Sequence, residues 1–364
     1  MTPRAMTDCR NRAHEQSRTS AQRKRFADNR LRAGDVVRVK TPAQIAIELE
    51  EDGTSAGMPF MHEMLSACGG TYTVAKSAHK TCDSAASAKL RGLDATVHLD
   101  GLRCDGSAHG GCQLGCLLYW KTAWLESARD RDLSADQPSS VVAKDAFQGL
   151  DNGRRLHGRD PNRGTYSCQS TEVPYASQPL PPSALSQYWR DVRSRNTSVV
   201  GLVRTLMLML ADRSSSHVRA SHFYAFLRTS AGRKLPWASR HPTGPLNHGI
   251  HVGDIVSVRT NKEIRATLDS AGRNRGLTFE AGMSAHCGKQ GEVVRRVEKI
   301  IDERSGRLRE LHNDCFVLEG VVCNGSHNRS CPRSAYLFWR GVWLNGDTGK
   351  PLGRGLSLDA PRNV

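Results

Sequence analysis

Hydrophobic and polar residues alternate in short stretches over two parts of the chain. After a Gly-Asp pair, Val37 and Val39 stand two positions apart, a period that predicts a strand with one buried face. Pro42 then precedes Ile45 and Leu49, a spacing that predicts a short helix with proline in its first turn. The same reasoning predicts further strands at 72–76, 95–102 and 117–125.

The whole pattern occurs twice. Residues 34–125, the first repeat, align without a gap with residues 253–344, the second repeat, at a constant offset of 219 positions. Each repeat has the same opening strand, three cysteines in register and a Trp-x₃-Trp pair. The matched residues are Cys68 and Cys287, Cys104 and Cys323, Cys112 and Cys331, Trp120 and Trp339, and Trp124 and Trp343. The tryptophans are expected to pack in a core, with a basic and aromatic surface for single-stranded nucleic acid as the alternative.

Several short strands and one helix in each repeat predict a mainly β protein with some α structure. The Gly-Asp-x-Val-x-Val opening resembles the first strand of SH3-like barrels, and this resemblance implies two homologous small SH3-like or related β-barrel domains. The expected organisation is a basic tail (1–33), the first repeat (34–125), a partly helical linker (126–252), the second repeat (253–344) and a C-terminal tail (345–364).

The linker differs from the repeats in composition. It is polar and rich in Gly, Pro and Ser as far as residue 182, which predicts irregular structure. A helix is predicted over 183–212, broken at 193–198, with Asn196 or Ser198 as the cap of its second half. Apolar residues on nearly every face at 206–210 predict that this half is buried against the repeats.

Charge and location limit the partners. The net charge is +16, and residues 1–33 alone carry nine Lys or Arg against three Asp or Glu. Such a tail binds nucleic acid or acidic membrane surfaces, or is simply solvated. No apolar run approaches the roughly 18 residues of a membrane span, and no secretory signal is evident, so a cytoplasmic location is expected.

In a reducing compartment, 11 cysteines favour metal ligands or buried thiols over disulfides. Cys112 and Cys116 have the close spacing of a zinc pair, which Cys82 and Cys104, or Cys168 from the linker, could complete. The second repeat has no close pair, but its cysteines could form one site. The candidate metal ligands are Cys82, Cys104, Cys112, Cys116, Cys168, Cys315, Cys323 and Cys331. Zinc is favoured over an iron–sulfur cluster, and buried thiols remain the alternative.

Two further resemblances bear on the cysteines. Cys104-Asp-Gly-Ser-Ala-His109 and Cys323-Asn-Gly-Ser-His327 resemble the Cys-Asp-Gly-Ser-His signature of a small iron–sulfur family, which implies a [2Fe–2S] cluster held by three cysteines and one histidine. The family's upstream Cys-x-Cys pair is missing, and a tight glycine turn is the preferred interpretation. The overall Gly-Asp-x-Val…Cys-x-Gly-Ser…Cys…Trp-x₃-Trp pattern resembles uncharacterised bacterial Cys-rich tandem-repeat proteins, which implies no particular activity.

Three functions follow from these observations. The favoured one is a zinc-stabilised tandem-domain protein that binds an unidentified protein partner without catalysis of its own. The second is a redox or cysteine-dependent enzyme with its site in the first repeat, where His79 and Cys82 stand close in sequence. The third is a nucleic-acid-binding protein. Phosphate-loop, dinucleotide-binding, zinc-protease and nucleophile-elbow motifs are missing from the sequence.

Overall fold

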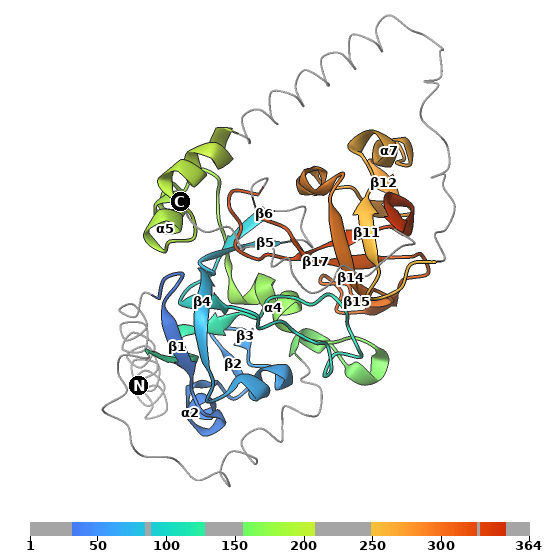
Figure 1. Cartoon of the computed structure of the whole chain (residues 1–364). Coiled ribbons are helices and arrows are strands. Elements are labelled where there is room, and N and C mark those ends of the chain that lie inside the picture. Colours follow the sequence, from blue (N-terminus) through green and yellow to red (C-terminus); the bar gives the residue numbers. More distant parts are fainter. Residues whose placement is uncertain (1–30, 84–88, 128–155, 208–248, 326–327, 347–364) are drawn as a thin grey trace, which may run out of the picture.

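A computed structural model describes residues 31–83, 89–127, 156–207, 249–325 and 328–346. Within these ranges the protein is mainly β, with antiparallel sheets and several short helices (Figure 1), as the sequence predicts at this level. Nearly all of the basic tail and most of the C-terminal tail lie outside the described residues. No helix in the described ranges is long and apolar enough to cross a membrane.

The first repeat forms a five-stranded sheet in the order β8-β7-β4-β1-β9. Val37 and Val39 on β1 are fully buried while Val36 is exposed, as the alternation predicts. Thr41 caps the helix α2, and Gln44 completes the capping box. The elements are β1 (Val36–Val39), α2 (Pro42–Glu48), β4 (Thr71–Ser77), β7 (Thr96–Leu99), β8 (Trp120–Lys121) and β9 (Leu125–Ser127).

The second repeat forms a sheet with the equivalent order, β18-β17-β14-β11-β19. Its strands and helix lie close to the positions that the offset of 219 residues gives, and β11, β14 and β19 coincide with them fully. The elements are β11 (Ile255–Val258), α7 (Asn261–Ala266), β14 (Gln290–Arg296), β17 (Phe316–Val322), β18 (Tyr336–Trp339) and β19 (Leu344–Gly346).

Shorter strands complete both repeats. In the first, β5 (Lys80–Asp83) and β6 (Lys89–Gly92) pair with each other, and β10 (Gln178–Pro179) of the linker adds to β6. In the second, β15 (Lys299–Ile301) pairs with β16 (Leu308–Glu310). The short pairs β2 (Thr54–Ser55) with β3 (Met58–Pro59), and β12 (Arg273–Asn274) with β13 (Leu277–Thr278), follow the two helices.

The four tryptophans of the two Trp-x₃-Trp pairs lie in the two main hydrophobic cores and are fully buried. Phe60 packs edge-on against Trp120 and Trp124, with ring centroids 6.3 and 5.3 Å apart. Phe279 packs in the same way against Trp343 at 5.6 Å. The prediction of core packing is confirmed, and these side chains offer no surface to nucleic acid.

The linker is more ordered than its composition predicts. Residues 156–182 contain two 3-10 turns, η4 (Leu156–Gly158) and η5 (Pro161–Arg163), then α4 (Gln169–Ala176) and β10. The prediction of irregular structure is wrong for residues 156–182, because buried contacts outweigh low propensity there; residues 128–155 lie outside the described ranges. The Gln169 amide donates to the carbonyls of Pro59 (3.0 Å) and Tyr119 (2.8 Å) and accepts from the Tyr119 N–H (2.8 Å), and Val173 joins the first core.

The linker helix predicted over 183–212 is broken where the sequence predicts the break, at 193–198. Helix α5 covers Ser186–Arg193, and a further helix begins at residue 199 and continues to 207, the last described residue of this segment. Ser198 caps it by accepting from the Gly201 N–H at 3.0 Å. Its predicted burial is wrong for 199–207, because Val200 and Met207 are more than half exposed; residues 208–212 lie outside the described ranges.

Helix α5 is fixed to the first repeat by a buried carboxylate. Asp191 is fully buried, and its two oxygens lie 2.5 Å from Lys80 Nζ and 3.2 Å from His79 Nε2. Burial lowers the pKa of both Lys80 and His79, and Asp191 acts in the opposite direction on each. Lys80 also donates to the carbonyl of Arg329, so its ammonium group joins both repeats and the linker.

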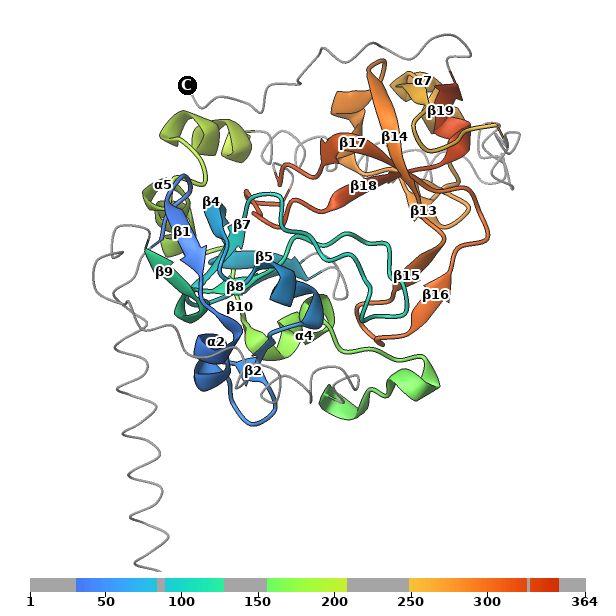
Figure 2. The same ribbon diagram turned by 60° about the horizontal axis from the view of Figure 1, so that its bottom comes forward.

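The two repeats meet in a reciprocal contact. The backbone N–H of Cys82 on β5 donates to Sγ of Cys331, with 3.1 Å between N and S. The equivalent strand β15 returns the same contact, because the N–H of Ile301 donates to Sγ of Cys112 at 3.3 Å. Residues 82 and 301, and residues 112 and 331, correspond at the offset of the repeats. Figures 1 and 2 show the two sheets side by side, with the β15–β16 hairpin reaching the first repeat.

Replacing Asp191 by asparagine leaves the buried Lys80 ammonium without a counter-charge. We expect Asp191→Asn to lower the free energy of unfolding by about 3 kcal/mol or more, measured by urea denaturation. The Lys80→Met, Asp191→Leu double variant should recover most of that loss. Glu310→Gln is the control, because its ion pair with Lys299 is exposed and is worth less than about 1 kcal/mol. Equal losses of stability in Asp191→Asn and Glu310→Gln would show that the buried carboxylate does not fix α5 to the first repeat.

Candidate metal centre

The loop between β7 and β8 holds Cys104, Cys112 and Cys116 close together. The N–H of Cys104 donates to the carbonyl of Cys116 at 2.9 Å, and Gly106 adopts φ +76° at the tip. The second repeat has the equivalent bond, from the Cys323 N–H to the Ala335 carbonyl at 2.7 Å. The tight glycine turn preferred from the sequence is therefore confirmed in both repeats.

Four of the eight predicted ligands surround one cavity, namely Cys104, Cys112, Cys116 and Cys168. The cavity measures about 20 Å³, room for a single ion or water molecule. Cys168 arrives from the linker as the N-cap of α4. The sequence analysis offered Cys168 as a ligand to complete the Cys112 and Cys116 pair, with Cys82 and Cys104 as the other choice, and the cavity combines Cys168 with Cys104.

The imidazole of His109 also lines this cavity and is held by a buried carboxylate. Its Nδ1 lies 2.5 Å from Oε1 of Glu63, a residue of the 3-10 helix η1 (His62–Ala67). This bond leaves Nε2 as the ring nitrogen available to a ligand. Histidines that bind metal are typically oriented in this way by a carboxylate.

Glu63 has further features of a metal site. Its Oε1 also accepts from the Ala108 N–H at 3.1 Å, while its Oε2 is buried without a hydrogen-bond partner. Glu63, Cys104 and His109 form the group of described residues whose ligand atoms all lie within 4.8 Å of one another. Cys112, Cys116 and Cys168 line the same cavity outside this tight group.

The thiols of the cavity are protonated in the absence of a cation. Burial raises the pKa of Cys104, Cys112 and Cys116, and it raises the pKa of Cys168 to about 12. For Cys104 the Glu63 carboxylate adds to the effect of burial. Burial also raises the pKa of Glu63, but the hydrogen bond and charge of His109 outweigh it, and the net pKa is lowered. Such thiols are poor nucleophiles and become good ligands only when a metal replaces their protons.

The other four predicted ligands lie elsewhere. Cys82 and Cys331 form a separate pair between the repeats, and Cys323 packs against the second core. Cys315 is buried in a small apolar cluster with Val297 and Val317. The ten cysteines of the described residues are all free thiols.

His79 and Cys82 do not form the nucleophile and base pair that their spacing suggested. The His79 ring faces Asp191, whereas Cys82 faces Cys331. His79 lies in the bend just before β5 and Cys82 lies on the strand, so the two side chains meet different partners.

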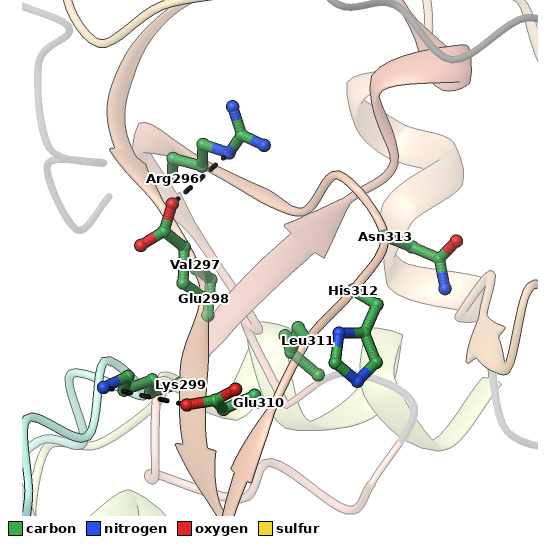
Figure 3. Close-up of a pocket in the computed structure, with 8 residues that line it drawn as sticks. All are labelled: Arg296, Val297, Glu298, Lys299, Glu310, Leu311, His312 and Asn313. Atoms are coloured by element: carbon green, nitrogen blue, oxygen red, sulfur yellow. Dashed lines mark ion pairs between the residues drawn. The ribbon is translucent and has the colours of Figure 1, made fainter.

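A larger hollow of about 280 Å³ lies beside the β15–β16 hairpin (Figure 3). Its charged side chains pair among themselves, Arg296 with Glu298 at 3.7 Å and Lys299 with Glu310 at 3.9 Å. All four are about half exposed or more, so the hollow presents solvated ion pairs rather than converging ligands.

Glu63 and His109 are candidate site residues absent from the predicted metal ligands, and His109 entered only through the iron–sulfur resemblance. A signal was present, because Glu63 aligns with Gly282 and is therefore private to the first repeat, as Cys116 is. No protein-family model, curated protein or solved structure matches the chain.

The glycine turn that positions Cys112 can be tested by substitution. An alanine Cβ at Gly106 would lie 2.0 Å from the Cys112 carbonyl oxygen, whereas Gly101, with φ +71°, has nothing within 4 Å. Gly101→Ala should cost about 1–2 kcal/mol from backbone strain, and Gly106→Ala clearly more, by urea denaturation. Gly325→Ala and Gly320→Ala form the matched pair in the second repeat. Equal losses within each pair would show that the close approach to the carbonyl is unimportant.

Proposed function

We propose that this protein is a zinc-stabilised tandem-repeat binding protein without catalysis of its own. The observation that carries the proposal is the single cavity where thiols from the first repeat and the linker meet a carboxylate-held imidazole. Sulfur and imidazole nitrogen are the ligands that zinc prefers, and a closed four-ligand site is typical of a structural role.

We assign the ligands to His109, Cys104, Cys116 and Cys168. Cys104, Cys116 and Cys168 line the same cavity, and Cys168 and Cys116 add to the effect of burial in raising the pKa of Cys104. Cys112 already accepts the N–H of Ile301 and so has a structural role between the repeats. Three of the four ligands are private to the first repeat or the linker, which supports a single ion per chain.

Zinc in this position would join the linker to the first repeat. Cys168 begins α4, and the other ligands lie on the loop that carries Cys104 to Cys116. Since the thiols are protonated without metal, binding releases protons and the apparent affinity rises with pH.

The binding role is supported by exposed apolar side chains on the linker helices. Leu185 and Trp189 stand one helical turn apart and are 76% and 65% exposed. Val199, Val200, Val203 and Met207 are also exposed on the next helix. Large apolar groups gathered in water are characteristic of sites for protein partners. The basic tail, on which nucleic-acid binding would depend, lies outside the described residues.

Metal analysis tests the first part of the proposal. Protein purified anaerobically should contain about one zinc per chain by elemental analysis, from the four-ligand site. Cys168→Ser and Cys116→Ser should lose most of the metal, while Cys315→Ser, which alters a thiol in an apolar cluster, should retain it. Removing zinc with a chelator should lower the melting temperature.

Chain without stoichiometric metal would overturn the zinc assignment. Visible absorption with bound iron would replace zinc by an iron–sulfur cluster at the same ligands, since zinc itself is colourless.

Trp189 tests the binding role. Trp189→Ser should change the free energy of unfolding by less than about 0.5 kcal/mol because the side chain is exposed. The same variant should reduce capture of a protein partner by about tenfold or more in affinity purification, as for a hot-spot residue. Ile47→Ser, another exposed apolar position but on α2, is the control and should keep the partner. Unchanged capture by Trp189→Ser would place the binding surface elsewhere.

A further inference from the structure

The two halves of the reciprocal contact between the repeats differ in the side chain of the residue that donates the N–H. In one half, the N–H of Ile301 meets the sulfur of Cys112; in the other, the N–H of Cys82 meets the sulfur of Cys331. Isoleucine offers nothing but packing at its position. Cysteine at position 82 brings a second thiol to Cys331, whose sulfur lies 3.1 Å from the Cys82 backbone nitrogen.

A buried arginine faces this pair of thiols. Arg333 donates to the carbonyl of Cys82 at 3.1 Å, to the hydroxyl of Ser170 at 3.2 Å and to the carboxylate of Glu303. Arg333 is 7% exposed, so its charge acts on Cys82 with little screening by water, and the Glu303 carboxylate opposes it.

The two sulfurs consequently differ in ionisation. The hydrogen bond from Cys331 and the charge of Arg333 hold the pKa of Cys82 well below its usual value, although burial opposes them. The same hydrogen bond and burial raise the pKa of Cys331. Cys82 is half-buried and Cys331 is 3% exposed, so Cys82 is also the more accessible residue of the pair.

We propose that Cys82 and Cys331 are a reversible dithiol–disulfide site that peroxides oxidise, and that its disulfide joins the two repeats covalently. An accessible thiolate beside a protected partner thiol is the arrangement that reactive dithiols require. Neither Cys82 nor Cys331 lines the proposed zinc cavity, although Arg333 connects the two sites through Ser170, whose hydroxyl donates to Cys116 at 3.3 Å.

The reaction has two steps. The Cys82 thiolate attacks one oxygen of the peroxide, an S–O bond forms, the O–O bond breaks, and the departing oxygen takes a proton to leave as water or an alcohol. The sulfur of Cys331 then attacks the sulfur of the Cys82 sulfenic acid, an S–S bond forms, and the hydroxyl leaves as water with the Cys331 proton. Two thiols are oxidised by two electrons, and the peroxide is reduced by the same two. A dithiol reductant reverses the bond by exchange.

Peptide mapping of the full chain tests the proposal. Zinc-loaded protein is treated with stoichiometric hydrogen peroxide, blocked with an alkylating reagent and digested without reduction. We expect more than half of the chains to yield one disulfide-linked pair of peptides, containing Cys82 and Cys331, which dithiothreitol removes. Zinc content, measured on the same sample, should stay constant. The zinc measurement tests the metal site and the linked peptides test the disulfide, so the two proposals can fail separately.

Variants identify the role of each sulfur. Cys331→Ser should abolish the linked peptides and leave Cys82 as a sulfenic acid that a dimedone probe labels. Cys82→Ser should abolish both products. Cys315→Ser should behave as the wild type. The proposal is overturned if wild-type Cys82 stays unmodified, pairs with another cysteine, or is oxidised beyond recovery by the reductant.

Discussion

The architecture depends on satisfying two backbone N–H groups where the repeats meet. Each belongs to an edge strand, β5 or β15, and each finds its acceptor in a cysteine sulfur of the other repeat. A buried N–H without a partner costs about 1–3 kcal/mol, so these contacts restrict how the sheets can approach. They also fix the loops that carry Cys112 and Cys331. Those loops in turn place the thiols around the cavity and beside Cys82.

The two repeats share a backbone arrangement but differ in the side chains that they carry at equivalent positions. Two framework cysteines, Cys112 and Cys331, make the contact between the repeats, and private residues supply most of the proposed chemistry. The private residues and their counterparts are Glu63 and Gly282, His109 and Asn328, Cys116 and Ala335, and Cys82 and Ile301. Every one of these differences gives the first repeat a titratable group that the second lacks. The symmetry of the backbone therefore coexists with asymmetric chemistry.

The opening strand and helix could be predicted, because the spacing of Val37 and Val39 in the strand and of Ile45 in the helix shows which face is buried. The ligand set was predictable only in part, since spacing associates Cys112 with Cys116 but cannot show that Cys168 returns across the linker. Gln169 and Asp191 explain why the linker was misjudged: both are polar, and both are buried by hydrogen bonds and charge that no hydropathy pattern records. The pairing of Cys82 with Cys331 is likewise tertiary, and only the alignment of Cys82 on Ile301 marked it as unusual.

The position of Lys80 has a consequence for the order of folding. Its ammonium group is completed by Asp191 of the linker and by the carbonyl of Arg329, which lies 249 residues further along the chain. At about 5–20 residues per second, a ribosome needs on the order of ten seconds or more to deliver that carbonyl. Until then water takes the place of the Arg329 carbonyl at the Lys80 ammonium. The first repeat of the nascent chain is therefore hydrated on the side that the second repeat later covers.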